Sequence, residues 1–124
     1  MRRLSWIFDL DGVVTANPAA ISWLTWHLKK NENCNEVYIL TWRHNNAERF
    51  QETWNDLERF GIVFDKLIMA PEKFKNAKEA GFWKINEVKK LKADIWFDDE
   101  IKSYQRDYGM NLEKLLPDVA KVWI

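Results

Sequence analysis

Near its N-terminus the chain carries the stretch LSWIFDLDG, which runs from Leu4 to Gly12. The apolar run Leu4–Phe8 has a high strand preference and predicts a buried strand. Asp9 and Asp11 follow it, and carboxylates beside a buried strand are costly unless they are paired, hydrogen-bonded or bound to a metal ion. The glycine lets the backbone turn sharply just after them. One carboxylate of such a pair can be a nucleophile and the other a general acid and base, although an acidic turn also fits the pattern.

Outward from this stretch, strand-like and helix-like segments alternate along the chain. The expected helices span Pro18–Lys30, Ala47–Phe60, Lys73–Leu91 and Glu100–Tyr108, and the further strands span Val37–Leu40, Ile62–Phe64 with Leu67–Met69, Ile95–Phe97 and Val119–Trp123. This alternation predicts an α/β fold, in which a mainly parallel sheet has helices on both faces. Ligands bind such sheets at the carboxyl ends of the strands.

The first predicted helix carries an apolar stripe. Ile21, Leu24 and Leu28 recur at the spacing of one helical face, and Trp23 and Trp26 widen it. The sequence has eight tryptophans, and most of them are expected to be buried or half-buried. We therefore expect this face of the helix to pack against the sheet.

A second acidic pair, Asp98-Asp99, follows the predicted strand Ile95–Phe97. On its own, an Asp-Asp pair is more often a solvated turn or a helix cap. Together with Asp9 and Asp11, however, it places several like charges at one end of the sheet, where they would repel one another without a cation. Oxygen ligands that arrive from two strand ends suit Mg²⁺. These four aspartates are therefore candidate ligands of a magnesium ion.

Several other residues could bind an anionic group at the same edge. Thr41 ends the second predicted strand, and its hydroxyl and nearby backbone N–H groups could hold a phosphate oxygen. The guanidinium of Arg43 could bind a phosphate or a carboxylate, although an isolated arginine is more often an ordinary surface residue. His44 follows it and could touch a substrate. Four lysines offer a cation that could balance the negative charge: Lys73, Lys75, Lys78 and Lys84. Their spacing alone does not choose among them.

Length and composition limit the classes of protein to which this chain can belong. The 124 residues are expected to form a single domain, residues 1–124. The 19 basic and 19 acidic residues give a formal net charge of zero, which argues against a non-specific nucleic-acid coat but leaves a local basic patch open. Cys34 is the only cysteine, so no intrachain disulfide is expected. Because no stretch resembles a leader peptide or approaches the roughly 20 apolar residues of a membrane span, we expect a cytoplasmic location and no membrane partner.

The motifs resemble those of the haloacid dehalogenase (HAD) superfamily of phosphotransferases. The superfamily's first motif, Asp-x-Asp-Gly-x-x-Thr after an apolar strand, is matched by DLDGVVT at residues Asp9–Thr15. Its second motif, a Ser or Thr that ends the next core strand, is matched by Thr41, and its fourth motif, an acidic pair, by Asp98-Asp99. The resemblance covers nearly the whole chain. It implies a three-layer Rossmann-like fold, and the short chain leaves no room for a substantial cap domain.

Two shorter runs are similar to the phosphatase domain of phage polynucleotide kinase/phosphatase and related nucleic-acid repair domains. Thr41-Trp42-Arg43 is similar to the Ser-Gly-Arg of those domains, and KEAGFWK at Lys78–Lys84 is similar to their Lys-Glu-x-x-Phe-Trp-Lys stretch. The resemblance selects Lys78 as the lysine of the third motif, with Lys84 as the alternative. Trp42 replaces a small residue, and it could narrow the entrance or stack on a base.

The resemblance implies a Mg²⁺-dependent phosphomonoester hydrolase that acts through an aspartyl-phosphate. Asp9 would be the nucleophile, and Asp11 would be the general acid and base. Mg²⁺ would be held by the Asp9 carboxylate, the Asp11 backbone carbonyl and Asp98, with Asp99 assisting. The residues that would bind the phosphate or the substrate are Thr41, Arg43 and Lys78.

The implied substrate is a nucleotide or polynucleotide end with a 3′ or 5′ phosphate, because a site without a cap is open to large substrates. A small-metabolite or protein phosphatase of the same mechanism is an alternative. A receiver-like signalling domain has similar residues, but its acidic pair comes early and its phosphate-accepting residue lies on a middle strand. Here Asp-x-Asp-Gly comes first in the chain and the Asp-Asp pair comes last. A non-catalytic binding module on the same fold is disfavoured, because loss of function would remove the reason to bury so much charge.

Overall fold

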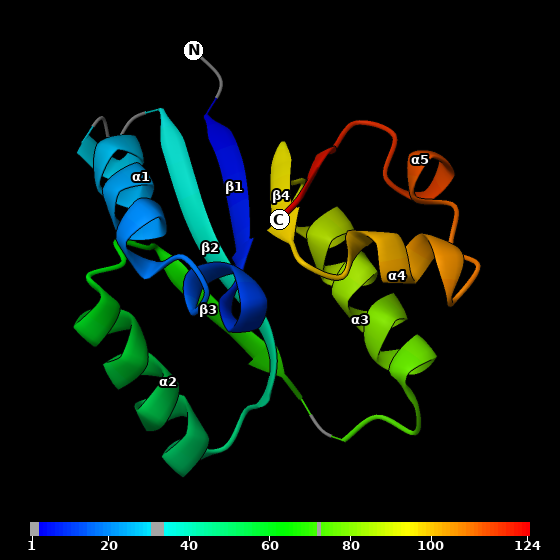
Figure 1. Ribbon diagram of the computed structural model, residues 1–124, viewed down its shortest axis with the longest axis horizontal. Helices are drawn as coiled ribbons and strands as arrows, with labels where there is room; N and C mark the ends of the chain where they lie inside the picture. Colours follow the sequence, from blue (N-terminus) through cyan, green and yellow to red (C-terminus); the bar gives the residue numbers. More distant parts are fainter. Residues whose placement is uncertain (1–2, 31–33, 72) are drawn as a thin grey trace.

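The computed structural model describes residues 3–30, 34–71 and 73–124. Strands and helices alternate around one five-stranded sheet (Figure 1). The strands are β1 (Leu4–Asp9), β2 (Asn35–His44), β3 (Lys66–Ala70), β4 (Ile95–Asp98) and β5 (Ala120–Trp123). A kinked turn, η1 (Leu10–Val14), follows β1, and its backbone departs from helical geometry at Asp11 and Gly12. The helices are α1 (Pro18–Lys30), α2 (Ala47–Phe60), α3 (Ala77–Lys90), α4 (Ile101–Arg106) and α5 (Leu112–Leu115).

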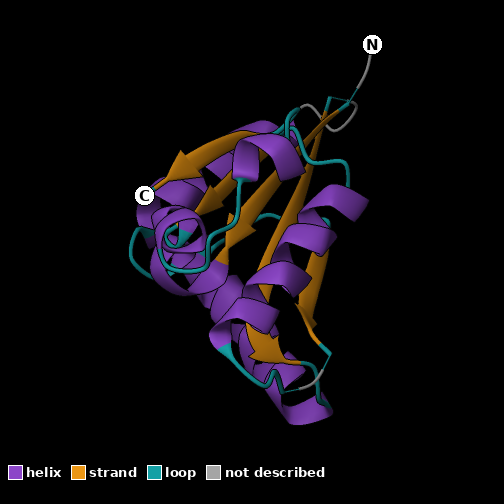
Figure 2. Cartoon of the chain, turned by 90° about the vertical axis from the view of Figure 1, so that its right-hand side faces the viewer, coloured by secondary structure: helices purple, strands orange, loops and turns teal. Residues whose placement is uncertain are grey.

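The sheet has the strand order β3-β2-β1-β4-β5, and every neighbouring pair of strands is parallel. Helices α1 and α2 cover one face of the sheet, and α3, α4 and α5 lie on the other (Figures 1 and 2). The prediction of a three-layer α/β fold with a parallel central sheet is therefore confirmed. Within the described residues, no insert large enough to form a cap separates these elements.

The pleat of each strand divides its side chains between two apolar cores. Ile7 packs in the core shared with α3, α4 and α5, and its neighbour Phe8 packs in the core shared with α1 and α2. Because side chains alternate along a strand, Asp9 follows Ile7 onto the α3 face. In β4, Trp96 belongs to the α3 core, so Asp98 falls on that face too. Since β1 and β4 pair directly, their terminal carboxylates lie side by side.

Two strand boundaries differ from those expected by more than two residues. β2 continues past Leu40 to His44, because it keeps pairing with β3 across a bulge. Residues Ile62–Phe64 do not form a strand, because Gly61 ends α2 in a left-handed conformation (φ 71°) and the chain joins the sheet only at Lys66. The first residue of that segment packs instead in the core under α1 and α2.

The helices on the α3 face also differ in extent. The expected helix from Lys73 begins only at Ala77, where the side chain of Asn76 accepts a hydrogen bond from a backbone N–H and caps α3. The expected helix Glu100–Tyr108 is shorter, and its regular part is α4. Helix α5 was not expected, because four residues are too few to show helical periodicity.

The tryptophans are less buried than expected. In α1, Ile21 is buried, but Trp23 and Trp26 are 63% and 54% exposed. Trp54 and Trp123 are exposed as well, so half of the eight tryptophans lie at the surface. Residues at the border of a helical stripe face solvent once the central positions fill the contact with the sheet. Even with this exposed apolar surface, no helix in the described part of the chain is long and apolar enough to cross a membrane.

Candidate active site

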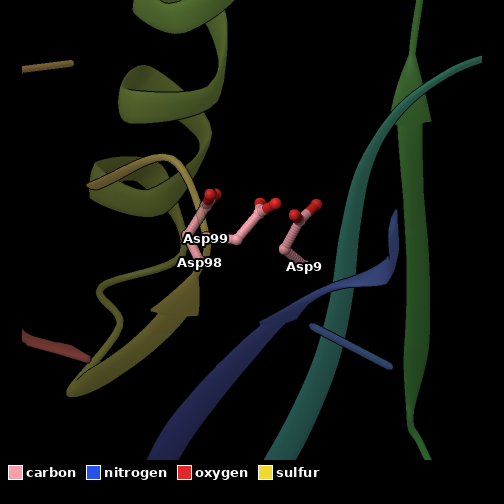
Figure 3. Close-up of side chains that lie close together, drawn as sticks. All are labelled: Asp9, Asp98 and Asp99. Carbon is pink, nitrogen blue, oxygen red and sulfur yellow. The ribbon is translucent and has the colours of Figure 1, made fainter. Parts of the chain in front are cut away.

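Three carboxylates meet where β1 and β4 end. Asp9 is the last residue of β1, Asp98 is the last residue of β4, and Asp99 follows it. Oxygen atoms of the three lie within 4.8 Å of one another (Figure 3). Asp9 is only 5% exposed and Asp98 is fully buried. The structure thus brings together three of the four carboxylates that the sequence identifies as candidate metal ligands.

A buried lysine contacts two of these carboxylates. The Nζ atom of Lys84 donates to Oδ1 of Asp9 at 2.7 Å and lies 3.0 Å from Oδ2 of Asp98. Lys84 is fully buried, and its Nζ lies 4.5 Å from the centre of the Trp42 ring, a distance that allows a cation–π contact. The negative charge of the cluster is therefore partly balanced by an ammonium group that is shielded from water.

Lys78, the lysine that the resemblance selects, lies elsewhere. Its side chain is exposed in the first turn of α3. Among the described residues, Lys84 and not Lys78 forms the ion pairs with the acidic cluster. An α-helix rises about 1.5 Å per residue, so the six steps from Lys78 to Lys84 separate the two lysines by about 9 Å along the axis. Lys84 lies on the buried face of α3, beside Ile85. The structure therefore places the alternative lysine at the site.

The cluster carries an excess of negative charge. Three carboxylates face one ammonium group, which leaves a formal charge of −2 when all four groups are ionised. Burial raises the pKa of the Asp9 carboxyl above its ordinary value; Lys84 opposes this shift and Asp98 adds to it. Burial lowers the pKa of the Lys84 ammonium, but the ion pairs with Asp98 and Asp9 outweigh it and leave this pKa raised. Lys84 therefore stays charged, and a divalent cation would balance the rest.

The donor set of the cluster fits a hard divalent cation such as Mg²⁺. All the ligand atoms are carboxylate oxygens, and they converge from two adjacent strands. Among the described residues, Asp9, Asp98 and Asp99 form the one group of three or more acidic, histidine or cysteine side chains close enough to share an ion. The carboxylate of Asp11 lies outside this group; the ligand atom that the resemblance implies for Asp11 is its backbone carbonyl.

Two further groups hold Asp98 in place. Its Oδ1 accepts a hydrogen bond from the backbone N–H of Glu100 at 2.7 Å, and its Oδ2 accepts one from the hydroxyl of Tyr104 at 3.4 Å. Burial, together with the charge of Asp98, raises the pKa of the Tyr104 phenol, so the hydroxyl remains a donor. The sequence analysis missed Tyr104. Its three-residue spacing from the apolar Ile101, which marks one helical face, is the signal that could have found it.

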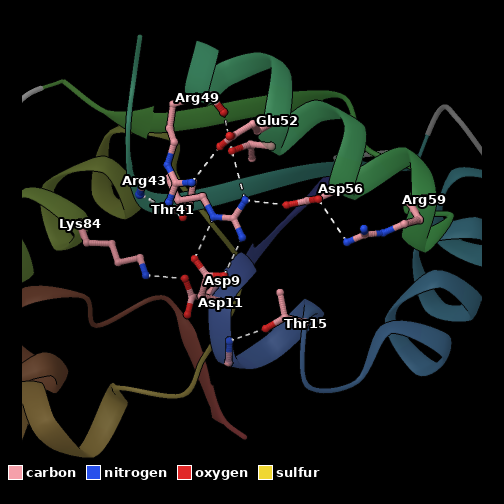
Figure 4. Close-up of polar contacts among 12 residues, drawn as sticks. Asp9, Asp11, Thr15, Thr41, Arg43, Arg49, Glu52, Asp56, Arg59 and Lys84 are labelled. Carbon is pink, nitrogen blue, oxygen red and sulfur yellow. Dashed lines mark hydrogen bonds and ion pairs between the residues drawn. The ribbon is translucent and has the colours of Figure 1, made fainter. Parts of the chain in front are cut away.

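The loop after β1 is closed by Gly12 and Thr15. The backbone N–H of Gly12 donates to Oγ1 of Thr15 at 3.0 Å, which fixes the turn that carries both motif aspartates (Figure 4). Gly12 has a φ of 91°, a left-handed conformation that residues with a Cβ disfavour. A Cβ atom at this position would overlap the carboxylate of Asp99. The glycine thus allows Asp99 to approach the other two aspartates.

We expect Gly12→Ala to disturb both the fold and the acidic cluster. The left-handed backbone costs about 1–2 kcal/mol for a residue with a Cβ, and the added methyl group would displace Asp99. Gly109→Ala is the matched control, because Gly109 also has a positive φ (64°) but no atom within 4 Å of its Cβ position. In denaturant unfolding both variants should lose stability. In calorimetric titration Gly12→Ala alone should bind Mg²⁺ about tenfold more weakly. Equal Mg²⁺ affinities would contradict a ligand role for Asp99.

Asp11 is paired with Arg43 at the rim of the site. The guanidinium donates from Nη2 to Oδ1 of Asp11 at 2.8 Å and from Nε to Oδ2 at 3.0 Å, which makes a bidentate pair (Figure 4). On α2, Asp56 accepts from Nη1 of Arg43 at 2.8 Å, and Oγ1 of Thr53 accepts from the same atom at 3.3 Å. Arg43 is therefore fixed between the motif loop and α2.

A pocket of about 260 Å³ adjoins these groups and contains Thr41 in its wall. Thr41 is almost fully buried, and its Oγ1 accepts a hydrogen bond from the backbone N–H of Arg43 at 3.2 Å. A larger cavity of about 720 Å³ lies near the start of β4 and contains none of the acidic cluster. The smaller pocket is lined by Asp9, Asp11, Gly12, Thr41, Trp42, Asp99 and Glu100. Its carboxylates, together with the ammonium group behind them, can bind and attack an electrophilic anionic group.

Comparisons with known proteins find similar folds but no similar sequence. No protein-family model matches the chain, and no curated protein matches it in sequence. Among solved structures, a chain of the Pnkp1/Rnl/Hen1 RNA repair complex superposes with a TM-score of 0.70, at 15% sequence identity, over 98% of this chain and 42% of that chain. A chain from a second Pnkp1/Rnl/Hen1 complex gives a TM-score of 0.66, at 14% identity, over 100% of this chain and 47% of that chain.

The chain thus spans less than half the length of these two structural neighbours. At such low sequence identity the likeness concerns the fold, because one fold can carry many functions. This chain therefore shares its five-stranded parallel α/β fold with one part of a protein that is found in an RNA repair complex.

Proposed function

We propose that this chain is a Mg²⁺-dependent phosphomonoester hydrolase of the HAD type, which acts on the phosphorylated end of a nucleotide or polynucleotide. The observation that carries the proposal is the buried contact of Lys84 with Asp9 and Asp98 at the ends of two adjacent strands. A buried ion pair adds little to stability, so this much buried charge is better explained by chemistry than by folding.

The sequence motifs support the same assignment. The residues that match the first, second and fourth HAD motifs, which are far apart along the chain, lie at one edge of the sheet. Lys84 takes the position of the third-motif lysine, in place of Lys78. A nucleophilic carboxylate, a proton-transfer carboxylate and a fixed cation are the groups that phosphoryl transfer through an aspartyl-phosphate requires.

In the first step, the Asp9 carboxylate attacks the phosphorus atom, and the bond from phosphorus to the leaving alcohol oxygen breaks. The product is an aspartyl-phosphate. Asp11 in its protonated form gives its proton to the leaving oxygen, so the alcohol departs neutral. The incoming phosphoryl group competes with Asp11 for the guanidinium of Arg43, and loosening of that ion pair frees the Asp11 carboxyl to face the leaving oxygen.

In the second step, a water molecule attacks the phosphorus atom of the aspartyl-phosphate. The Asp11 carboxylate accepts a proton from this water, and the bond from phosphorus to the Asp9 oxygen breaks. Inorganic phosphate leaves, and both aspartates return to their starting states.

The chain provides positive charge and donors around the phosphoryl oxygens. Lys84 supplies a permanent positive charge beside Asp9. The Oγ1 atom of Thr41 already accepts a hydrogen bond from a backbone N–H, so its own O–H is free to donate to a phosphoryl oxygen. Mg²⁺ would be held by the carboxylates of Asp9, Asp98 and Asp99 and by the backbone carbonyl of Asp11, and when bound it would neutralise negative charge on the phosphoryl group.

Two observations support a nucleotide end as the substrate. The structural neighbours are chains of RNA repair complexes. The described chain has no cap-sized insert, and the side chain of Asp11 is 58% exposed, so the phosphate of a large substrate can reach the pocket. A phosphate at the end of a strand would enter the pocket first and leave the rest of the strand outside.

Phosphate release, measured with Mg²⁺ and with a chelator, tests the proposal. The panel contains a generic aryl phosphate, a sugar phosphate, mononucleotides, and oligonucleotides phosphorylated at the 3′ or the 5′ end. We expect release that requires Mg²⁺ and is fastest with a nucleotide or an oligonucleotide. Faster release from the sugar phosphate would contradict the substrate class, and absence of release from the whole panel would contradict the hydrolase.

We expect Asp11→Asn to slow both chemical steps by about 10²- to 10⁴-fold, because an amide neither donates nor accepts the transferred proton. Asp56→Asn is the matched control, since Asp56 also pairs with Arg43 but lies outside the pocket. Rapid-mixing measurements of alcohol and phosphate release follow the two steps separately. If both variants slow the reaction equally, Asp11 would act by positioning Arg43 and not by proton transfer.

A further inference from the structure

A second pocket, of about 440 Å³, lies beside the acidic one and falls in the size range of ligand sites in proteins, roughly 300–1,000 Å³. It is bounded by the end of β2, the loop before α3 and the segment after β4. Trp42 and Glu100 line both pockets, so the two pockets are neighbours that share these side chains. A molecule whose phosphate lies at Asp9 has to pass these shared side chains to reach the second pocket.

Aromatic rings form part of the wall of the second pocket. Trp42, Phe74 and Tyr108 all line it. Neighbouring residues hold two of these rings in place. Nε1 of Trp42 donates a hydrogen bond to the carbonyl of Ala80 at 3.0 Å, and the centre of the Phe74 ring lies 5.7 Å from the centre of the Trp83 ring. Aromatic rings held in this way present a ready-made face to a flat ligand at little cost in conformational entropy.

Polar side chains from three segments line the same pocket. Lys73 offers a donor, Glu100 an acceptor, and His44 a ring that can do either. The Nδ1 atom of His44 is buried and has no hydrogen-bond partner among the described residues, so part of its hydrogen-bonding capacity is unused. The pocket thus combines flat apolar surface with donors and acceptors, which is the pattern that a nitrogen heterocycle requires.

We propose that the second pocket binds the base of the nucleotide whose phosphate lies at Asp9. The inference rests on the proposed function, which supplies the phosphate. A nucleobase stacks on aromatic rings through its face and forms hydrogen bonds through its edge. An aromatic side chain of a phosphopeptide could stack in the same place, but it would leave Lys73 and Glu100 without new partners. Because stacking accepts every base, the pocket selects nucleotides over base-free phosphate esters.

The test compares kcat/KM for a nucleoside monophosphate with kcat/KM for the ribose phosphate that carries its phosphate at the same position. Wild type should prefer the nucleotide, and Phe74→Ala should reduce this preference about tenfold or more, as expected for the loss of one stacking ring. The matched control is Phe82→Ala, because Phe82 is an exposed phenylalanine of α3 that does not line the pocket. It should keep the wild-type preference.

A second pair of variants keeps the test decisive if Phe74→Ala does not fold. Lys73→Ala removes a polar group of the pocket, and Lys75→Ala removes an exposed lysine two residues away that does not line it. Lys73→Ala should lower the preference for the nucleotide, and Lys75→Ala should not. If wild type and either Phe74→Ala or Lys73→Ala prefer the nucleotide equally, the proposal is overturned. It is also overturned if these variants hydrolyse a phosphotyrosine peptide more slowly than wild type does but hydrolyse the nucleotide at the wild-type rate.

Titration with a nucleoside that carries no phosphate separates this inference from the proposed function. We expect adenosine and cytidine to shift the backbone amide NMR signals of residues 73–80 in wild type, and to do so much less in Phe74→Ala. Such shifts in a protein that releases no phosphate would support the base pocket while contradicting the hydrolase. Phosphate release without any nucleoside-induced shift would overturn the base pocket and leave the hydrolase standing.

Discussion

Asp9→Asn should lower the rate of phosphate release by at least about 10⁴-fold, because an amide oxygen cannot form the covalent bond to phosphorus. Asp9 is the last residue of the central strand and lies against Lys84, in the wall of the pocket that would hold the phosphate. The loss should appear in kcat, since the remaining groups that bind the phosphoryl oxygens are unchanged.

The fold of Asp9→Asn should persist. Lys84 keeps its contact with Asp98 at 3.0 Å, and the amide oxygen of an asparagine can still accept a hydrogen bond from Nζ. The substitution also removes a carboxyl group whose charged form is disfavoured by burial and by the neighbouring Asp98, which favours the folded state when no cation is bound. The thermal midpoint should therefore change by no more than about 5 °C.

Steady-state phosphate release and thermal unfolding of the same preparation check both parts of this expectation. Normal turnover by the variant would contradict the assignment of Asp9 as nucleophile. A variant that has lost both activity and cooperative unfolding would show that the aspartate serves the fold instead.

Lys84→Met should reduce both stability and activity. Removing one partner of a buried ion pair costs about 3–5 kcal/mol, because the other partner is left buried and unpaired, and here two carboxylates lose the same ammonium group. For a chain of this length such a loss lowers the thermal midpoint by about 10–20 °C. Methionine keeps much of the length of the side chain, so lost packing accounts for little of the effect.

Lys78→Met is the matched control for Lys84, because Lys78 is an exposed lysine on the same helix. We expect it to leave the thermal midpoint and phosphate release close to those of wild type. Mg²⁺ should raise the midpoint of Lys84→Met more than that of wild type, since the ion replaces the missing positive charge. A larger effect at Lys78 than at Lys84 would contradict the site described here.

Much of the fold could be predicted because its signals are local. Helices α1 and α2 begin and end where the sequence predicts, and for α2 the reason is visible in its caps. The side chain of Asn46 accepts a hydrogen bond from the backbone N–H of Arg49, and Gly61 ends the helix. The segment Ile62–Phe64 is as apolar as a strand, but its position relative to the sheet depends on contacts that no local pattern contains.

The carboxylates of the candidate site could be found from the sequence, but the correct choice between Lys84 and Lys78 could not be made. Acidic residues directly after buried strands are local features that mark the sheet edge. Lys78 and Ile85 are seven residues apart, close to two helical turns, so the helical period alone would place Lys78 on the same side of α3 as the buried Ile85. Which lysine meets Asp9 depends on how far α3 extends past the strand ends, and tertiary packing determines that.

The partners of Arg43 could not be identified because they lie on another element. In β2, Ile39 packs in the core shared with α1 and α2, so the period of two places Arg43 on the α2 face. That pattern indicates which helix Arg43 meets. It does not indicate which residues of α2 it meets, and the structure shows that these are Thr53 and Asp56.

The most direct test of the proposed chemistry is covalent capture of the phosphate. Wild type would be mixed briefly with a substrate that carries a radiolabelled terminal phosphate, quenched under conditions that preserve acyl phosphates, and mapped by peptide. We expect label on the peptide that contains Asp9, formed before free phosphate accumulates and missing from Asp9→Asn. Rapid phosphate release with no label on the protein, or with label on another residue, would contradict the aspartyl-phosphate mechanism.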